Sequence, residues 1–136
     1  MKTTLHPIPK TLLALMLAFA TGSLVHFIHN AEFVKSYPGL PPNWTRAGVY
    51  GVWLAITAVG GAGYALLRRG YQRTGLVVVA AYSLFGLDSL GHYLLAPPSA
   101  HSLGMNLTIL LEVVPAALVL CMALYLLARQ ALVARP

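Results

Sequence analysis

Hydrophobic residues in this chain fall into four long runs, which cover residues 11–30, 47–67, 74–95 and 103–128. Each run holds about 20 residues or more, which is the length that a helix needs to cross the hydrocarbon core of a bilayer. Short polar segments join the runs and leave no room for a separate soluble module. The pattern therefore predicts an all-α fold, an integral membrane antiparallel four-helix bundle that forms one domain, residues 1–136.

The composition supports a membrane protein. Of the 136 residues, 58% are hydrophobic and only 9% are charged, with a mean hydropathy of +0.73. This leaves too little polar surface to cover a soluble globule. The formal net charge of +6 could indicate nucleic-acid binding, but no basic stripe with interleaved aromatic residues is present. We therefore expect membrane lipid as the surrounding partner and no nucleic acid.

Most basic residues gather at the termini and in one connection. They are Lys2, Lys10, Arg68, Arg69, Arg73, Arg129 and Arg135, whereas the other two connections carry only Lys35 and Arg46. Those two connections are rich in proline, which ends helices. By the positive-inside rule both termini and the basic connection face the cytoplasm. We therefore expect a membrane protein that crosses the bilayer several times.

A second interpretation exists for the first run. Its basic start, its apolar core and the sequence Ala18-Phe19-Ala20 also fit a cleaved secretory signal peptide. However, the apolar run continues past Ala20 to Ile28, as a spanning helix requires. We therefore favour a membrane span and keep cleavage as the alternative.

The acidic residues are the most informative polar feature. All three of them, Glu32, Asp88 and Glu112, lie inside or at the mouth of an apolar run. An acidic side chain at mid-bilayer costs at least about 2.5 kcal/mol, so such a residue is by default a candidate for function. On the predicted topology, Asp88 and Glu112 lie roughly 10 to 14 Å below the outer boundary, at about 1.5 Å per helical residue. The polar groups thus share the outer leaflet.

Helical spacing groups these acids with histidines. His26, His29 and Glu32 follow one another at i,i+3, and Asp88 and His92 are i,i+4, which are separations that place side chains on one helix face. Imidazole and carboxylate ligands suit a divalent metal, with zinc, iron or manganese as candidates. The predicted metal ligands are His26, His29, Glu32 and His92, and the predicted catalytic carboxylates are Asp88 and Glu112.

A structural interpretation of the same residues remains open. Each histidine and carboxylate could form a charge-assisted hydrogen bond that only pins two helices together. For His26 and His101 the sequence does not decide between the two roles. Asn106 fits a hydrogen bonder at a helix start better than a ligand, and the lone Cys121 fits a small buried hydrophobic residue.

The same residues resemble a known family. H-N-A-E (His29 to Glu32), a proline-containing loop, D-x-x-x-H in the third run and Gly104, Thr108 and Pro115 in the fourth are similar to the small bacterial membrane proteins named for an H-x-x-E-E motif. Two positions depart from the pattern, with Phe33 in place of the second glutamate and Asp88 where an asparagine is expected. The resemblance implies a bacterial multi-span protein and no assigned reaction.

Three functions follow from these observations. The first is a membrane-embedded, metal-dependent enzyme, in which Asp88 or Glu112 acts as a general base on a lipid-like substrate. The second is a cation or proton carrier or binding module, and the third is a structural helper subunit of a membrane complex. A homo-oligomer is compatible with each.

Overall fold

The structure is a computed structural model that describes residues 8–133. In this range it is helical and has no strand. The α-helices are α1 (Lys10–Glu32), α2 (Arg46–Arg68), α3 (Gln72–Leu87), α4 (His92–Leu95) and α5 (Leu103–Val133), and short 3-10 segments occupy Val34–Ser36, Asp88–Gly91 and Pro98–Ala100.

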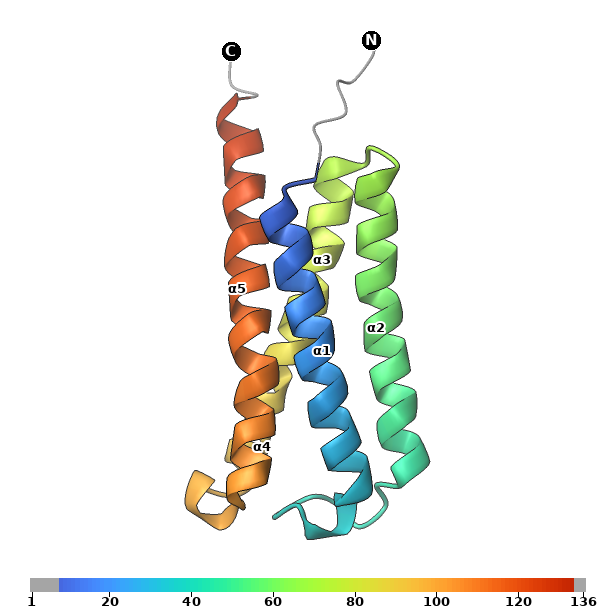
Figure 1. The fold of residues 1–136 in the computed structure, drawn as a ribbon, viewed down its shortest axis with the longest axis vertical. Helices are drawn as coiled ribbons and strands as arrows, with labels where there is room; N and C mark the ends of the chain where they lie inside the picture. Colours follow the sequence, from blue (N-terminus) through green and yellow to red (C-terminus); the bar gives the residue numbers. More distant parts are fainter. Residues whose placement is uncertain (1–7, 134–136) are drawn as a thin grey trace.

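Four helical segments of the described chain are long and apolar enough to cross a membrane. They are Lys10–Glu32, Arg46–Arg68, Gln72–Leu95 and Leu103–Val133. These segments match the four predicted runs, and the largest difference is that the last one continues to Val133. The long helices lie side by side, and the two described chain ends lie at the same end of the molecule as the α2–α3 turn (Figure 1).

The span predicted over residues 74–95 is present as Gln72–Leu95, but its helix changes type after Leu87. After Leu87 the chain passes through a 3-10 segment, Asp88–Gly91, before the short α4 begins at His92. The sequence D-S-L-G explains the break, because Asp and Ser side chains compete for backbone hydrogen bonds and Gly weakens a helix. In an α-helix, residues four apart are about 40° apart around the axis, whereas in a 3-10 helix they are about 120° apart. The regular α-helical geometry that their spacing assumed therefore does not hold, although Asp88 stays close enough to His92 for its charge to act on that ring.

The helix ends agree with local sequence signals. The Thr45 side chain accepts a hydrogen bond from the Gly48 N–H at 3.1 Å and so caps the start of α2. At the other end, Gly70 has a φ of 89°, and the Tyr71 N–H bonds the Leu66 carbonyl, as in a Schellman motif. These caps set the length of α2 and turn the chain directly into α3.

Close backbone contact joins α1 to α5 at Gly22. A Cβ atom at this position would lie 2.1 Å from the Leu111 carbonyl oxygen. In a regular helix that carbonyl accepts from the residue four positions later, but this residue is Pro115, which has no N–H. Gly22 therefore packs against a carbonyl group that the helix leaves without its usual partner.

The interior divides into an apolar half and a polar half. Near the chain ends the core consists of buried hydrophobic side chains from α1, α2, α3 and α5: Leu12, Met16, Phe19, Leu67, Leu76, Val79, Tyr82, Ala116, Val119 and Ala123. Toward the opposite end, the buried polar side chains are Ser23, His26, Asn30, Ser83, Ser89, His101 and Glu112. The helices thus bring the candidate functional residues together at one end of the bundle.

Candidate functional site: a buried histidine cluster

Four histidines surround one tyrosine at the polar end of the bundle. His26, His29, His92 and His101 each have a ring centroid within 6.4 Å of the centroid of Tyr37. We call these five residues the histidine cluster. They come from α1, from the loop after it, from α4 and from the loop before α5, so only the tertiary fold assembles them.

His26 and Glu112 form the deepest part of the site. Their side chains are 1% and 0% exposed, and His26 Nε2 lies 3.7 Å from Glu112 Oε2. The Ser89 hydroxyl donates a hydrogen bond to the same carboxylate oxygen. The 3.7 Å between His26 Nε2 and Glu112 Oε2 is too long for a hydrogen bond and short enough for an ion pair. The predicted association of a histidine with a carboxylate therefore exists, between α1 and α5.

The partners of His26 define its tautomer. The Thr108 hydroxyl donates to the Met105 carbonyl at 3.1 Å, and its oxygen lies 3.4 Å from His26 Nδ1. Because the Thr108 hydrogen is already used, Nδ1 of His26 must be the donor of this weak contact. Nε2 of a neutral His26 then has a free lone pair that faces Glu112.

Tyr37 covers the cluster from the loop between α1 and α2. It is only 4% exposed, and its hydroxyl lies 2.9 Å from Nδ1 of His29. Burial raises the pKa of Tyr37 to about 12, so the phenol stays neutral over the physiological pH range. Gly39 keeps this loop close to α4, because it has a φ of 74° and a Cβ there would lie 2.9 Å from the Leu95 carbonyl oxygen.

His92 and His101 carry buried nitrogens without a partner. The amide nitrogen of Asn30 lies 3.3 Å from His92 Nε2, and His101 Nδ1 donates to the Pro97 carbonyl at 3.0 Å. Among the described residues, His92 Nδ1 and His101 Nε2 make no hydrogen bond, and neither does the amide oxygen of Asn30. The two rings lie 6.2 Å apart between centroids. Buried polar atoms are almost always paired, so these atoms mark a place where a ligand would bind.

Glu32 lies outside the cluster, although the spacing of H-x-x-E predicted one face for His29 and Glu32. The Glu32 carboxylate binds Arg46 at 2.7 Å and accepts a hydrogen bond from the Tyr50 hydroxyl at 2.9 Å. Both partners belong to α2. The pair is exposed, at 38% for Glu32 and 67% for Arg46. A carboxylate that already binds an arginine is a poor metal ligand, so the structure gives Glu32 a role in joining α1 to α2.

Asp88 is also separated from the other carboxylate. It is exposed at the start of the 3-10 segment, whereas Glu112 is fully buried. Of the six predicted site residues, His26, His29 and His92 belong to the histidine cluster, and Glu112 faces His26. The exposed Asp88 lies close enough to His92 for its charge to act on that ring. Glu32 alone is drawn away, to Arg46.

No preformed metal centre is present in residues 8–133. Within this range no three His, Cys, Asp or Glu side chains lie in a geometry that could hold a metal ion. The nearest approach to one is the pair of unpaired nitrogens on His92 and His101. A rotation of the Asn30 amide would let its oxygen accept from His92 Nε2, which would leave a lone pair on Nδ1. Each imidazole would then be held by a carbonyl oxygen, as metal-binding histidines usually are.

Sequence reasoning missed several of these residues. Neither Tyr37 nor Asn30 was marked by a spacing pattern. Tyr37 lies in a loop, and Asn30 is a middle residue of H-N-A-E, a pattern in which only the histidine and the glutamate were considered. The role of His101 was left undecided, and the structure places it inside the cluster. Asn106 behaves as expected at a helix start, because its amide donates to the carbonyls of Pro98 and His101.

Comparison of the chain with protein-family models, with curated proteins and with solved structures finds no match. The resemblance to the H-x-x-E-E proteins therefore stays a prediction. The function has to be argued from the geometry of the histidine cluster.

Proposed function

We propose that this chain is an antiparallel four-helix membrane protein of the bacterial inner membrane, with both termini in the cytoplasm, whose histidine cluster binds a divalent transition-metal ion near the outer face. The observation that carries the proposal is the pair of buried, unpaired nitrogens, His92 Nδ1 and His101 Nε2, on neighbouring rings. A metal ion would satisfy both of them at once.

The ligand set differs from the one that spacing predicted. His92 and His101 are the primary ligands, and His26 is the nearest further imidazole, with its centroid 5.5 Å from that of His92. His29 and Glu32 have other partners, Tyr37 and Arg46. With imidazoles as the main donors, zinc, iron, copper and nickel fit the site, whereas manganese prefers oxygen ligands.

Metal analysis of the purified protein tests the proposal. We expect roughly one metal ion per chain in wild type and most of it lost in His101→Ala and His92→Ala, because removal of a ligand weakens binding strongly. His29→Ala is the matched control, since it removes a histidine of the same cluster whose nitrogen bonds Tyr37. A folded protein without metal, or an equal loss in the control, would contradict the proposal.

Proton binding is a second candidate function, and the His26–Glu112 pair favours it. A proton held by either group lies between the two side chains, and the rings of His26, His92 and His101 succeed one another at 5.5 and 6.2 Å toward the outer loops. The core beyond Glu112 is apolar, with Phe19, Val79 and Ala116 fully buried. This arrangement supports exchange of a proton with the outer side and not passage through one chain.

Catalysis has less support than binding. Neither of the two hollows described in the structure is lined by a residue of the histidine cluster. The second candidate, proton binding, is tested by infrared spectroscopy. It predicts a pH-dependent change in the carboxyl band of Glu112 that is absent in Glu112→Gln. Its absence in wild type would remove this candidate.

A further inference from the structure

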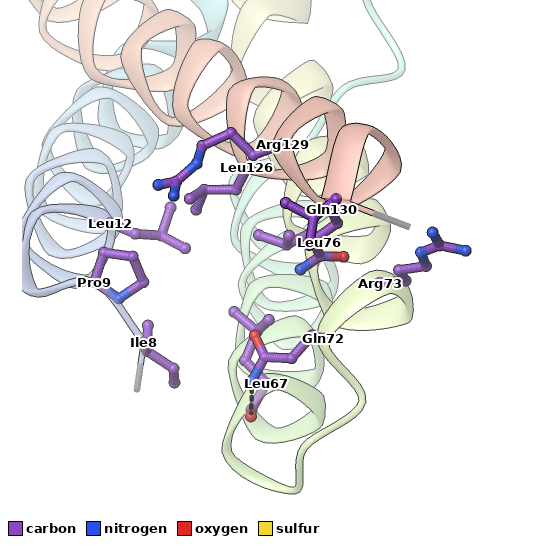
Figure 2. Close-up of a pocket in the computed structure, with 11 residues that line it drawn as sticks. Ile8, Pro9, Leu12, Leu67, Gln72, Arg73, Leu76, Leu126, Arg129 and Gln130 are labelled. Carbon is purple, nitrogen blue, oxygen red and sulfur yellow. Dashed lines mark hydrogen bonds between the residues drawn. The ribbon is translucent and has the colours of Figure 1, made fainter. Parts of the chain in front are cut away.

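A hollow at the opposite end of the molecule has no part in the histidine cluster. It has a volume of about 580 Å³ and lies where the start of α1, the α2–α3 turn and the end of α5 meet (Figure 2). Its lining combines seven apolar residues with four polar ones: Ile8, Pro9, Leu12, Leu67, Leu76, Leu126 and Val133, with Gln72, Arg73, Arg129 and Gln130. We call it the basal hollow.

The positive charge around the basal hollow is not balanced by acidic side chains of the protein. Lys10, Arg68, Arg69, Arg73 and Arg129 all belong to this end. The only acidic side chains in the sequence are Glu32, Asp88 and Glu112, and these lie in the other half of the molecule, where Glu32 is already paired with Arg46. Any acidic group that neutralises Arg129 must therefore come from outside the side chains of this protein.

We infer that the basal hollow binds an anionic phospholipid, with the phosphate at Arg129 and an acyl chain along the leucines. The inference is independent of the proposed metal site. The lining matches such a lipid, because it combines apolar side chains with two arginines. Figure 2 shows Arg129 on the side of Leu12 and Arg73 on the opposite side. Arg129, next to the apolar Leu12, is the principal contact in this proposal, and Arg73 adds to the positive potential of the lining.

The headgroup must provide the selectivity. The lipid tails of the bilayer are as apolar as the leucines of the hollow. Moving an acyl chain from the bilayer into the hollow therefore contributes little to the free energy of binding. A basic side chain near the surface of an anionic leaflet increases lipid binding by about fivefold. The chain's own N-terminal residues are a poor alternative occupant, because the only charged residue among residues 1–7 is Lys2, which arginine would repel.

Native mass spectrometry of the full chain in detergent, titrated with phosphatidylglycerol and separately with phosphatidylcholine, tests the inference. Wild type should bind phosphatidylglycerol more tightly, and Arg129→Gln should reduce this preference about fivefold. Arg69→Gln is the matched control, since it removes the same charge at the same end from a residue that does not line the hollow. Arg129→Lys should keep most of the preference because the charge remains.

Three outcomes would overturn the inference. One is equal affinity for the two lipids in wild type, and another is an equal loss in Arg129→Gln and Arg69→Gln, which would indicate unspecific surface charge. The third is a rise in phosphatidylglycerol binding after deletion of residues 2–7, which would show that the N-terminal residues occupy the hollow. Loss in Arg129→Gln with retention in Arg69→Gln would support it.

Discussion

Gly22→Ala should destabilise the protein more than the same substitution at any glycine of α2. The new Cβ would lie 2.1 Å from the Leu111 carbonyl oxygen and 2.8 Å from its carbon. Both atoms belong to the backbone, so no side chain can rotate away. This contact would have to lengthen from 2.1 Å to at least 3.4 Å, the start of ordinary van der Waals contact. Overpacking of this kind costs about 1 to 3 kcal/mol.

The same displacement should reach the functional site. Cα of Glu112 lies 3.4 Å from the position of the added Cβ, and the Glu112 carboxylate faces His26 on α1. A shift of α5 relative to α1 would therefore lengthen the 3.7 Å separation of these two groups. We expect Gly22→Ala to disturb the His26–Glu112 pair as well as to lower stability.

Thermal unfolding in detergent, followed by the fluorescence of Trp44 and Trp53, measures the effect. Gly61→Ala is the control, because a Cβ at Gly61 meets no atom within 4 Å. Alanine is favoured over glycine in a helix by about 1 kcal/mol, so this variant should be as stable as wild type or slightly more stable. Equal melting temperatures for Gly22→Ala and Gly61→Ala would refute the close contact between α1 and α5.

Further predictions concern topology, the carboxylate and the tyrosine. Without Cys121, a cysteine at Gly70 should react only with membrane-permeant thiol reagents, and one at Pro41 or Ser99 with impermeant ones; the opposite labelling would invert the topology. Glu112→Gln should keep the fold because an amide still accepts from Ser89, whereas Glu112→Ala should cost about 1 to 3 kcal/mol by leaving that hydroxyl unpaired; equal melting temperatures of the two variants would contradict this. Tyr37 should titrate near pH 12, seen as tyrosinate absorbance that is missing in Tyr37→Phe. Because its folded pKa is raised, the resulting stabilisation is complete below about pH 10 and is lost as the pH rises through 12; a titration at about 10 would show that the phenol is not buried.

The amino-acid sequence alone determined the number and place of the helices. An apolar run long enough for a membrane span forms a helix whatever its neighbours are, because every backbone group must then be satisfied within the segment. The ends of α2 also depend on local sequence, because Thr45 caps its start and Gly70 ends it, each within one turn of the helix. The gathering of polar residues at one end also follows from their positions along the runs.

Only the tertiary structure decided which of those residues meet. Helical spacing fixes the angle between His29 and Glu32 but not the direction in which that face points, and the fold directs Glu32 to Arg46 and His29 to Tyr37. The 3-10 segment at residues 88–91 changes the helix geometry between Asp88 and His92, and the loops bring in His101. These outcomes depend on helix rotation and on loop paths, which are set by contacts such as that of Gly22 with the Leu111 carbonyl, between residues far apart in the chain.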